Sequence, residues 1–297
     1  MRRLINRYST ALLMAPYAVL FCFFIVIPVM AAVGLSFTYF NTIESPSFTG
    51  LDNYITLLTN DSVFMQKVLP NTILYAIFVG AGGYILAFFL AWSLSQISHK
   101  PRTILAILIY SPSMTGSVLI SSVWGVIFSG DKNGYLNYWL MELKVITEPV
   151  NWLQSEEYLL PIMILVALWS SMGIGFLAIL AGILGVNEEL YEAAYIDGVK
   201  NRFQEIIYIT IPAAKPQMLF GAVMAIVNTF QSSGIGVALC GANPTPNYAG
   251  QLIVTHIEDF GFIRYEMGYA AAISVVLLIG IRAISKGAEK VFGSADE

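Results

Sequence analysis

The sequence predicts an all-α polytopic membrane protein with six transmembrane helices. Three observations lead to this prediction: an unusually apolar composition, six long intervals without charged residues, and basic residues gathered at alternate ends of those intervals. Of the 297 residues, 57% are hydrophobic and only 11% are charged, whereas a soluble domain carries roughly 25% charged residues. We therefore expect a single transmembrane domain over residues 1–297 and a lipid bilayer as its surroundings.

The composition also argues against several functions. The formal net charge of −4 is small and gives no indication of nucleic-acid binding. Cys22 and Cys240 lie in apolar stretches, so we expect small hydrophobic residues there and not a disulfide or metal site. His99 and His256 are predicted on opposite sides of the membrane, so they cannot share a metal. Both are expected to be ordinary loop residues, and no metal or cofactor is expected.

Six intervals free of Asp, Glu, Lys and Arg locate the spans, because a transmembrane helix needs about 20 mostly apolar residues. The last interval is short, so its helix is expected to extend past Arg282, whose long side chain can reach the membrane surface. The first apolar block is too long for a signal peptide and is expected to remain as a span. The predicted spans are residues 11–36, 70–95, 103–128, 158–185, 216–240 and 266–285.

Basic residues set the orientation of these spans, because cytoplasmic loops carry an excess of Lys and Arg. With six spans, both termini and the loops 96–102 and 186–215 share one side. Eleven basic residues fall on that side, and only Lys67, Lys132, Lys144 and Arg264 fall on the other. The termini and the loop 186–215 are therefore predicted to be cytoplasmic.

Three loops, residues 39–69, 129–157 and 241–265, are predicted on the outer side. The loop 129–157 combines five acidic residues with Trp139 and Trp152. Two interpretations stay open for these loops: solvated segments with aromatic anchors at the membrane interface, or a docking face for an external partner.

Residues 187–216, here named the elbow, form the most polar long segment of the chain and connect the fourth and fifth spans. Asn187 is a suitable N-cap, with acidic residues in the first helical turn, and Gly198 suits a helix end that needs positive φ. Asn201 is expected to cap a second helix, with Gln204 three residues on, as in a capping box. The pattern predicts helix, glycine turn and helix on the membrane surface. One face of the first helix is apolar, from Tyr191, Tyr195 and Val199.

Polar side chains inside spans are costly unless they face a cavity or a partner group. Such residues occur in spans three, four and five and are candidates for a solute pathway, where hydroxyl and amide groups pair with sugar hydroxyls and aromatic rings stack on sugars. Hydrogen bonding and packing between helices remain the alternative interpretation for each of them. The candidates are Tyr110, Ser111, Ser113, Trp169, Ser170, Ser171, Asn228, Gln231, Ser232 and Ser233.

The elbow resembles the signature of the membrane permease subunits of binding-protein-dependent ABC importers, in the carbohydrate-uptake branch that includes the larger maltose permease. That signature is Glu-Ala-Ala, three residues, Gly, nine residues and Ile-x-Leu-Pro. Here it corresponds to Glu192-Ala193-Ala194, Gly198 and Ile209-Thr210-Ile211-Pro212. Ten residues instead of nine follow Gly198, and Ile211 replaces Leu. Residues 50–54, Gly-Leu-Asp-Asn-Tyr, are also similar to a segment of the family after the first span.

The resemblance implies a type I ABC importer permease that forms half of a pathway for a sugar or oligosaccharide. It implies four kinds of partner: two copies of a cytoplasmic ATPase, a second homologous permease, an extracytoplasmic binding protein and the sugar. The elbow would be the coupling helix of a multi-pass protein in the bacterial cytoplasmic membrane. The chain has no phosphate-binding Gly-rich loop of its own, so we expect no nucleotide binding. The coupling residues are expected to be Glu189, Glu192, Ala193, Ala194, Asp197 and Gly198.

Three alternatives to a sugar importer are considered. An ABC permease for a non-sugar solute remains open. A secondary transporter or channel is less favoured, because ion-coupled carriers often hold charged residues inside their spans and this chain has none there. A membrane enzyme is not expected, because neither His-Glu-x-x-His nor Gly-x-Ser-x-Gly occurs.

Overall fold

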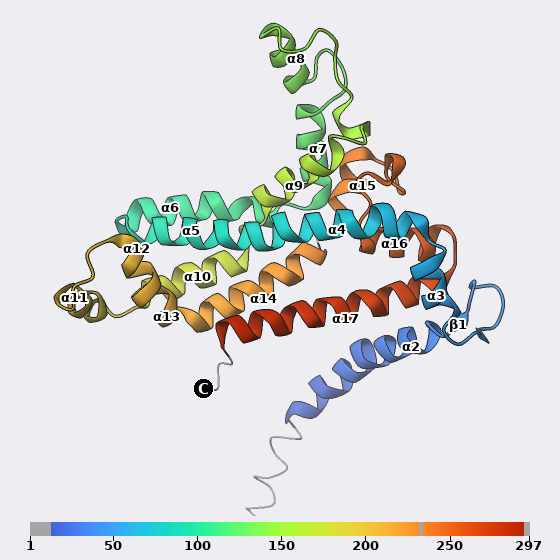
Figure 1. Ribbon diagram of the computed structural model, residues 1–297, viewed down its shortest axis with the longest axis horizontal. Coiled ribbons are helices and arrows are strands. Elements are labelled where there is room, and N and C mark those ends of the chain that lie inside the picture. Colours follow the sequence, from blue (N-terminus) through green and yellow to red (C-terminus); the bar gives the residue numbers. More distant parts are fainter. Residues whose placement is uncertain (1–12, 232–233, 294–297) are drawn as a thin grey trace, which may run out of the picture. The chain divides into compact units, whose positions relative to one another are not determined.

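The computed structural model describes residues 13–231 and 234–293 (Figure 1). Three helices in this part of the chain are long and apolar enough to cross a membrane: Leu13–Leu35, Phe64–Ser95 and Met267–Val291. Three bent helix pairs meet the same criterion when each pair is counted as one span. The described chain therefore holds up to six spans, and the predicted all-α polytopic class is confirmed.

The bent pairs show where the sequence-based spans are interrupted. The pair His99–Met114 and Leu119–Ile127 is bent by 98°, and the pair Leu159–Ser170 and Ile174–Leu184 by 46°. Pro112 lies in a tight 3-10 turn at the first break, where a proline cannot donate a backbone hydrogen bond. Gly173 lies at the second, with a ψ of −147° that ends the helical path. The third pair, Arg202–Ala213 and Lys215–Phe230, bends by 84° where the elbow meets the fifth span.

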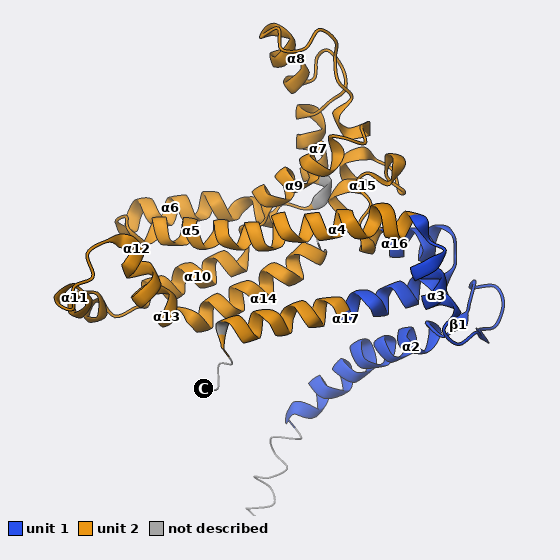
Figure 2. Cartoon of the chain, viewed as in Figure 1, with its two compact units in different colours: residues 1–62, 256–279 blue, residues 63–255, 280–297 orange. Residues whose placement is uncertain are grey.

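Contacts within the chain divide it into two compact units (Figure 2). Unit 1 comprises residues 1–62 and 256–279, as far as they are described. A short antiparallel pair in this unit aligns Thr38 with Phe48 and Tyr39 with Ser47. The elements that begin or lie in unit 1 are η1 (Cys22–Val26), α2 (Ile27–Leu35), β1 (Thr38–Tyr39), β2 (Ser47–Phe48), α3 (Asp52–Thr59), η9 (Asp259–Ile263) and α17 (Met267–Phe292).

Unit 2 comprises residues 63–255 and 280–297, as far as they are described, and contains the elbow and the second to fifth spans. Its second span is one continuous helix built from η2 (Phe64–Val68), α4 (Leu69–Tyr75), η3 (Ala76–Gly82) and α5 (Gly83–Ser95). The remaining elements are α6 (His99–Tyr110), η4 (Ser111–Met114), α7 (Ser117–Ile127), α8 (Tyr135–Glu142), η5 (Trp152–Gln154), α9 (Leu159–Ser170), α10 (Ile174–Leu184), α11 (Glu188–Ile196), α12 (Arg202–Glu205), η6 (Ile206–Thr210), α13 (Ile211–Ala213), α14 (Lys215–Gln231), α15 (Ile235–Cys240), η8 (Pro246–Tyr248) and α16 (Ile253–Glu258).

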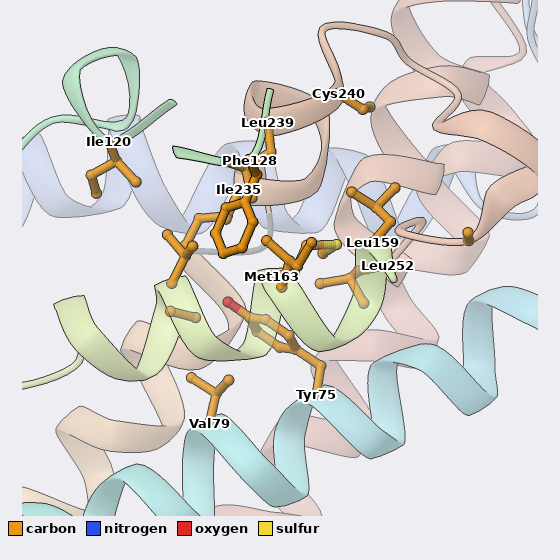
Figure 3. Close-up of a cluster of buried hydrophobic side chains, with 14 residues drawn as sticks. Tyr75, Val79, Ile120, Phe128, Leu159, Met163, Ile235, Leu239, Cys240 and Leu252 are labelled. Atoms are coloured by element: carbon orange, nitrogen blue, oxygen red, sulfur yellow. The ribbon is translucent and has the colours of Figure 1, made fainter. Parts of the chain in front are cut away.

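Two apolar clusters hold unit 2 together. In the first, Tyr75 and Val79 of the second span point toward Met163 of α9 and Ile235 of α15 (Figure 3). The second lies among α5, α10 and α14 and contains Ala91, Ile179 and Met218. Small residues let these helices approach closely: a side chain at Gly175 would lie 3.2 Å from the carbonyl oxygen of Gly221.

The expectation that His256 is an ordinary loop residue is wrong. Its ring is only 1% exposed, and its Nε2 lies 3.0 Å from Asp61 Oδ2, which also accepts a hydrogen bond from the Tyr269 hydroxyl at 2.8 Å. Phe260 stacks edge-on against both rings. Buried polar side chains need such partners. The network therefore joins the end of the segment 50–61 to the start of α17 inside unit 1.

Asn137 organises the segment between α7 and η5. It is fully buried, its amide nitrogen donates to the carbonyls of Ser129, Asp131 and Val150, and its amide oxygen accepts from the Val150 backbone and Trp152 Nε1. The Asn137 side chain thus connects residues 129–131 to residues 150–152 by hydrogen bonds.

We expect Asn137→Ala to open this segment, because five hydrogen-bonding groups lose their partner at a cost of about 1–3 kcal/mol each where water cannot replace it. Limited proteolysis should then cut residues 129–152 about tenfold faster or more. Asn133→Ala is the matched control, because Asn133 is exposed in the same segment. Equal cleavage rates in the two variants would contradict the role of Asn137.

Candidate functional site

The first helix of the elbow, α11, begins where the sequence predicts. The Asn187 side chain accepts a hydrogen bond from the backbone of Glu189 at 3.1 Å, so it caps the helix. Glu188 and Glu189 occupy the first turn, where the helix dipole favours negative charge. Figure 1 shows α11 beyond the ends of α5 and α10 of the same unit, with α12 and α13 between it and those helices.

The turn after α11 is built around Gly198. The Val199 amide donates to the Ala194 carbonyl at 2.9 Å and the Gly198 amide to the Tyr195 carbonyl at 3.3 Å, which together form a Schellman motif. Gly198 has a φ of +96°, a conformation that other residues rarely adopt. No atom lies within 4 Å of an added Cβ, so the requirement for glycine is conformational and not steric.

The second helix of the elbow is continuous from Arg202 to Ala213, through α12, η6 and α13. Asn201 caps it by accepting a hydrogen bond from the Gln204 backbone at 2.8 Å. Gln204 Oε1 accepts in return from the Lys200 amide at 2.9 Å and not from that of Asn201. The predicted capping box is therefore present with its return bond displaced by one residue.

A buried carboxylate connects the two helices of the elbow. Glu205 is only 5% exposed and accepts hydrogen bonds from Arg202 Nη1 at 2.8 and 3.0 Å and from the Tyr195 hydroxyl at 3.3 Å. The hydrogen bond to Glu205 raises the pKa of Arg202, so the charged pair is favoured. A second link joins the hydroxyls of Tyr191 and Thr210 at 3.2 Å.

Sequence reasoning missed Glu205, although the signal was present. Arg202 and Glu205 are three residues apart on one helix, the spacing of an ion pair. Tyr191 and Tyr195 form the predicted apolar face of α11, and their hydroxyls point to the second helix through the bonds to Thr210 and Glu205. The two hydroxyls therefore tie the tyrosine face to the second helix, while the Tyr195 ring stays 54% exposed, and the opposite face of α11 is exposed as well.

The six predicted coupling residues lie on or next to this outer face. Glu189, Glu192, Ala193, Asp197 and Gly198 are exposed, and Ala194 is half-buried. Large apolar side chains accompany them and are exposed too: Ile196 by 87%, Phe203 by 70% and Leu190 by 49%. Exposed apolar side chains beside charged residues occur at protein–protein contacts. The surface is acidic on α11, with Glu188, Glu189, Glu192 and Asp197.

A cavity of about 500 Å³ lies inside unit 2, between the second, third, fourth and fifth spans. Of the predicted pathway residues, Tyr110, Ser113, Ser170, Ser171 and Asn228 line it. Gly173 lies at its wall, because an added Cβ would be 3.7 Å from both Asn228 Nδ2 and Ser113 Cβ. The structure thus brings candidates from three spans together at the break between α9 and α10.

The other predicted pathway residues are placed differently. Trp169 is not among the residues that line the cavity; it is 43% exposed and stacks edge-on against Trp124 at 5.5 Å. Ser232 and the side chain of Gln231 lie outside the described residues. Sequence reasoning missed Tyr84, Thr115 and Thr229, which also line the cavity. The signal for Thr229 was its place beside Asn228.

A family model and several known proteins match this chain. The family model described as "Binding-protein-dependent transport system inner membrane component" matches residues 83–285. The arabinooligosaccharides transport system permease protein AraP of Bacillus subtilis (strain 168) is 32% identical over 94% of this chain and 87% of its own length. The lactose transport system permease protein LacF of Rhizobium radiobacter is 26% identical over 92% of this chain and 90% of its own.

A solved structure has the same fold. It is a chain of a bacterial ABC transporter involved in the import of the acidic polysaccharide alginate, with a TM-score of 0.79 and 22% identity. The match covers 99% of both chains. A second solved structure, of a bacterial alginate ABC transporter with its pentasaccharide-bound periplasmic protein, matches with a TM-score of 0.78 and 21% identity, over 98% of this chain and 96% of its own.

Proposed function

Because this chain belongs to the family of binding-protein-dependent transport system inner membrane components, we propose that it is the membrane-spanning half of an ATP-driven importer for a sugar or oligosaccharide. The observation that carries this proposal is the elbow. It combines the family's signature with a rigid, doubly capped geometry and an exposed acidic and apolar face. The printed names of the relatives support a carbohydrate as the solute.

In this proposal, the elbow couples the spans to a cytoplasmic ATPase. Glu189, Glu192 and Asp197 make polar contacts to that partner, and Ala193 and Ala194 permit close approach. Gly198 sets the angle between the two helices. A rigid elbow is required because a lever transmits movement only when its two arms are fixed to each other. The bonds of Glu205 and of Tyr191 supply that connection.

The assembly follows from the same premise. This chain pairs with a second, related permease, two ATPase subunits bind on the cytoplasmic side, and a solute-binding protein delivers the sugar from outside. Both termini and the elbow are then cytoplasmic, and the two compact units act as one transmembrane domain. The bias of eleven basic residues against four supports this orientation.

The cavity at the break between α9 and α10 is the proposed sugar pathway. We expect Asn228→Ala to raise the KM for uptake roughly fivefold, because one amide–hydroxyl hydrogen bond is worth about 1 kcal/mol. ATP-dependent uptake by the complete importer in proteoliposomes measures this effect. Asn133→Ala, in an exposed segment, is the control and should leave uptake unchanged. Unchanged kinetics in Asn228→Ala, with normal assembly, would place the pathway elsewhere.

A further inference from the structure

The cavity formed by the second to fifth spans is lined mostly by apolar residues and glycine, and its polar side chains are all uncharged. No Asp, Glu, Lys, Arg or His is among the described residues that line it. The sequence extends this observation to the neighbouring positions, because all lining residues fall in the four intervals 68–98, 103–130, 158–187 and 216–255. These intervals contain no Asp, Glu, Lys, Arg or His. The residues between the described parts, Ser232 and Ser233, are uncharged as well.

Its polar groups are those that suit hydroxyl-rich solutes. Tyr110, Ser113, Ser170 and Asn228 line it, and hydroxyls and amides both donate and accept hydrogen bonds. Sugar hydroxyls do the same, so these groups are complementary. The aromatic residues Phe176 and Tyr110 are also among the lining residues. The volume of about 500 Å³ lies within the roughly 300–1,000 Å³ of pockets that enclose drug-sized ligands, the size class of a short oligosaccharide.

From this lining we infer that the solute is an uncharged short oligosaccharide and not an acidic one. The inference rests on the proposed function, and it narrows the substrate class at the same site. An ionised carboxylate that leaves water needs a cationic partner or several aligned donors, and burial without one is strongly unfavourable. A uronic-acid oligosaccharide carries one such charge on every sugar unit, and this wall offers no cation to any of them.

Membership of the family does not decide whether the solute is neutral or acidic. The solved importer that shares this fold takes up alginate, an acidic polysaccharide, whereas AraP is named for arabinooligosaccharides and LacF for lactose, which are neutral sugars. The discriminating feature is therefore the charge of the lining in the chain itself.

Transport by the complete importer, with its binding protein, second permease and ATPase, tests the inference. Uptake into proteoliposomes is measured with neutral probes (lactose, maltotriose, arabinotriose and a wider library of neutral di- and trisaccharides) and with acidic probes (di- and trigalacturonate). We expect ATP-dependent uptake of a neutral probe and none of the acidic ones. ATP-dependent uptake of galacturonate oligomers would overturn the inference while leaving the sugar importer standing. Uptake of no saccharide of either kind would remove the proposed function, and the inference with it.

A matched pair of variants tests the same point inside the cavity. Asn228→Asp and Asn228→Leu are close to isosteric with the native side chain, and only the first adds a negative charge. For a neutral sugar, uptake by Asn228→Asp should be no lower than by Asn228→Leu, because a carboxylate still accepts hydrogen bonds from hydroxyls. For an acidic solute, repulsion should reduce uptake by Asn228→Asp at least about tenfold below that of Asn228→Leu. That second result, in variants that assemble normally, would contradict an uncharged solute.

Discussion

Gly198→Val is expected to reduce coupled transport strongly while the protein still inserts into the membrane and pairs with the second permease. The native φ of +96° is unfavourable for any residue with a Cβ, by roughly 1–2 kcal/mol, and most of all for a β-branched one. The Schellman turn must then open, so α11 leaves its fixed angle to the second helix. We expect ATP-dependent uptake to fall by roughly five- to thirtyfold, since 1.4 kcal/mol corresponds to a factor of ten. The solute-stimulated part of the ATPase activity should be lost in parallel.

Gly280→Val is the matched control for this substitution. Gly280 lies in α17, and an added Cβ there meets no atom within 4 Å, so the same chemical change is accommodated in a helix. Its uptake should stay near the native level. Native uptake and native ATPase stimulation in Gly198→Val would show that the geometry of the turn does not matter for coupling.

Glu205→Ala is expected to have the second largest effect. The substitution removes three hydrogen bonds at once, so Tyr195 and Arg202 lose the acceptor that they share. Hydrogen bonds to a charged group contribute about 1.5–3 kcal/mol to stability. The contribution of the Arg202–Glu205 ion pair is smaller than this, because the Arg202 side chain is exposed to solvent that screens its charge. A loss of about 2 kcal/mol in elbow rigidity predicts roughly tenfold lower uptake, or more.

The control is Glu289→Ala, because Glu289 pairs with Arg282 at 3.6 Å with both side chains largely exposed. Such surface pairs contribute little, so uptake should stay near the native level. Glu205→Gln separates charge from shape, since the amide still accepts from Tyr195 but cannot form the ion pair, and its uptake should fall between the native level and that of Glu205→Ala. Equal, native-like uptake in all three variants would mean that Glu205 does not hold the elbow together.

The elbow could be predicted closely because its signals are local. Caps and turns depend on a few neighbouring residues, so Asn187, Gly198 and Asn201 are found where the spacing puts them. Long apolar helices can be expected in charge-free intervals for a similar reason, since a spanning helix excludes charge along its whole length. The breaks at Pro112 in span three and at Gly173 in span four are harder to predict from the sequence. Proline and glycine also occur in membrane helices that have no sharp break, so the residue type alone does not locate a bend.

The features that sequence reasoning missed depend on contacts between distant segments. Glu205 is charged and lies in the polar elbow, a pattern typical of an exposed side chain, and only the fold shows that it is buried and bonded to Tyr195. His256 and Asp61 are far apart in the sequence and meet through tertiary contacts. Trp169 carried a signal for sugar stacking, but its neighbour in space is Trp124. The sequence pattern alone does not distinguish a tryptophan that stacks on a sugar from one that packs against another aromatic side chain.

Recovery of the partners that bind the elbow tests the central claim most directly. The chain is tagged in its native cell, extracted gently and purified with and without Gly198→Val, and the co-purifying proteins are identified. We predict a cytoplasmic ATP-binding subunit and a second permease with the native chain, and loss of the ATP-binding subunit with the altered elbow. Recovery of the chain alone, with transport in proteoliposomes that needs no ATP, would contradict the account and indicate a carrier or channel.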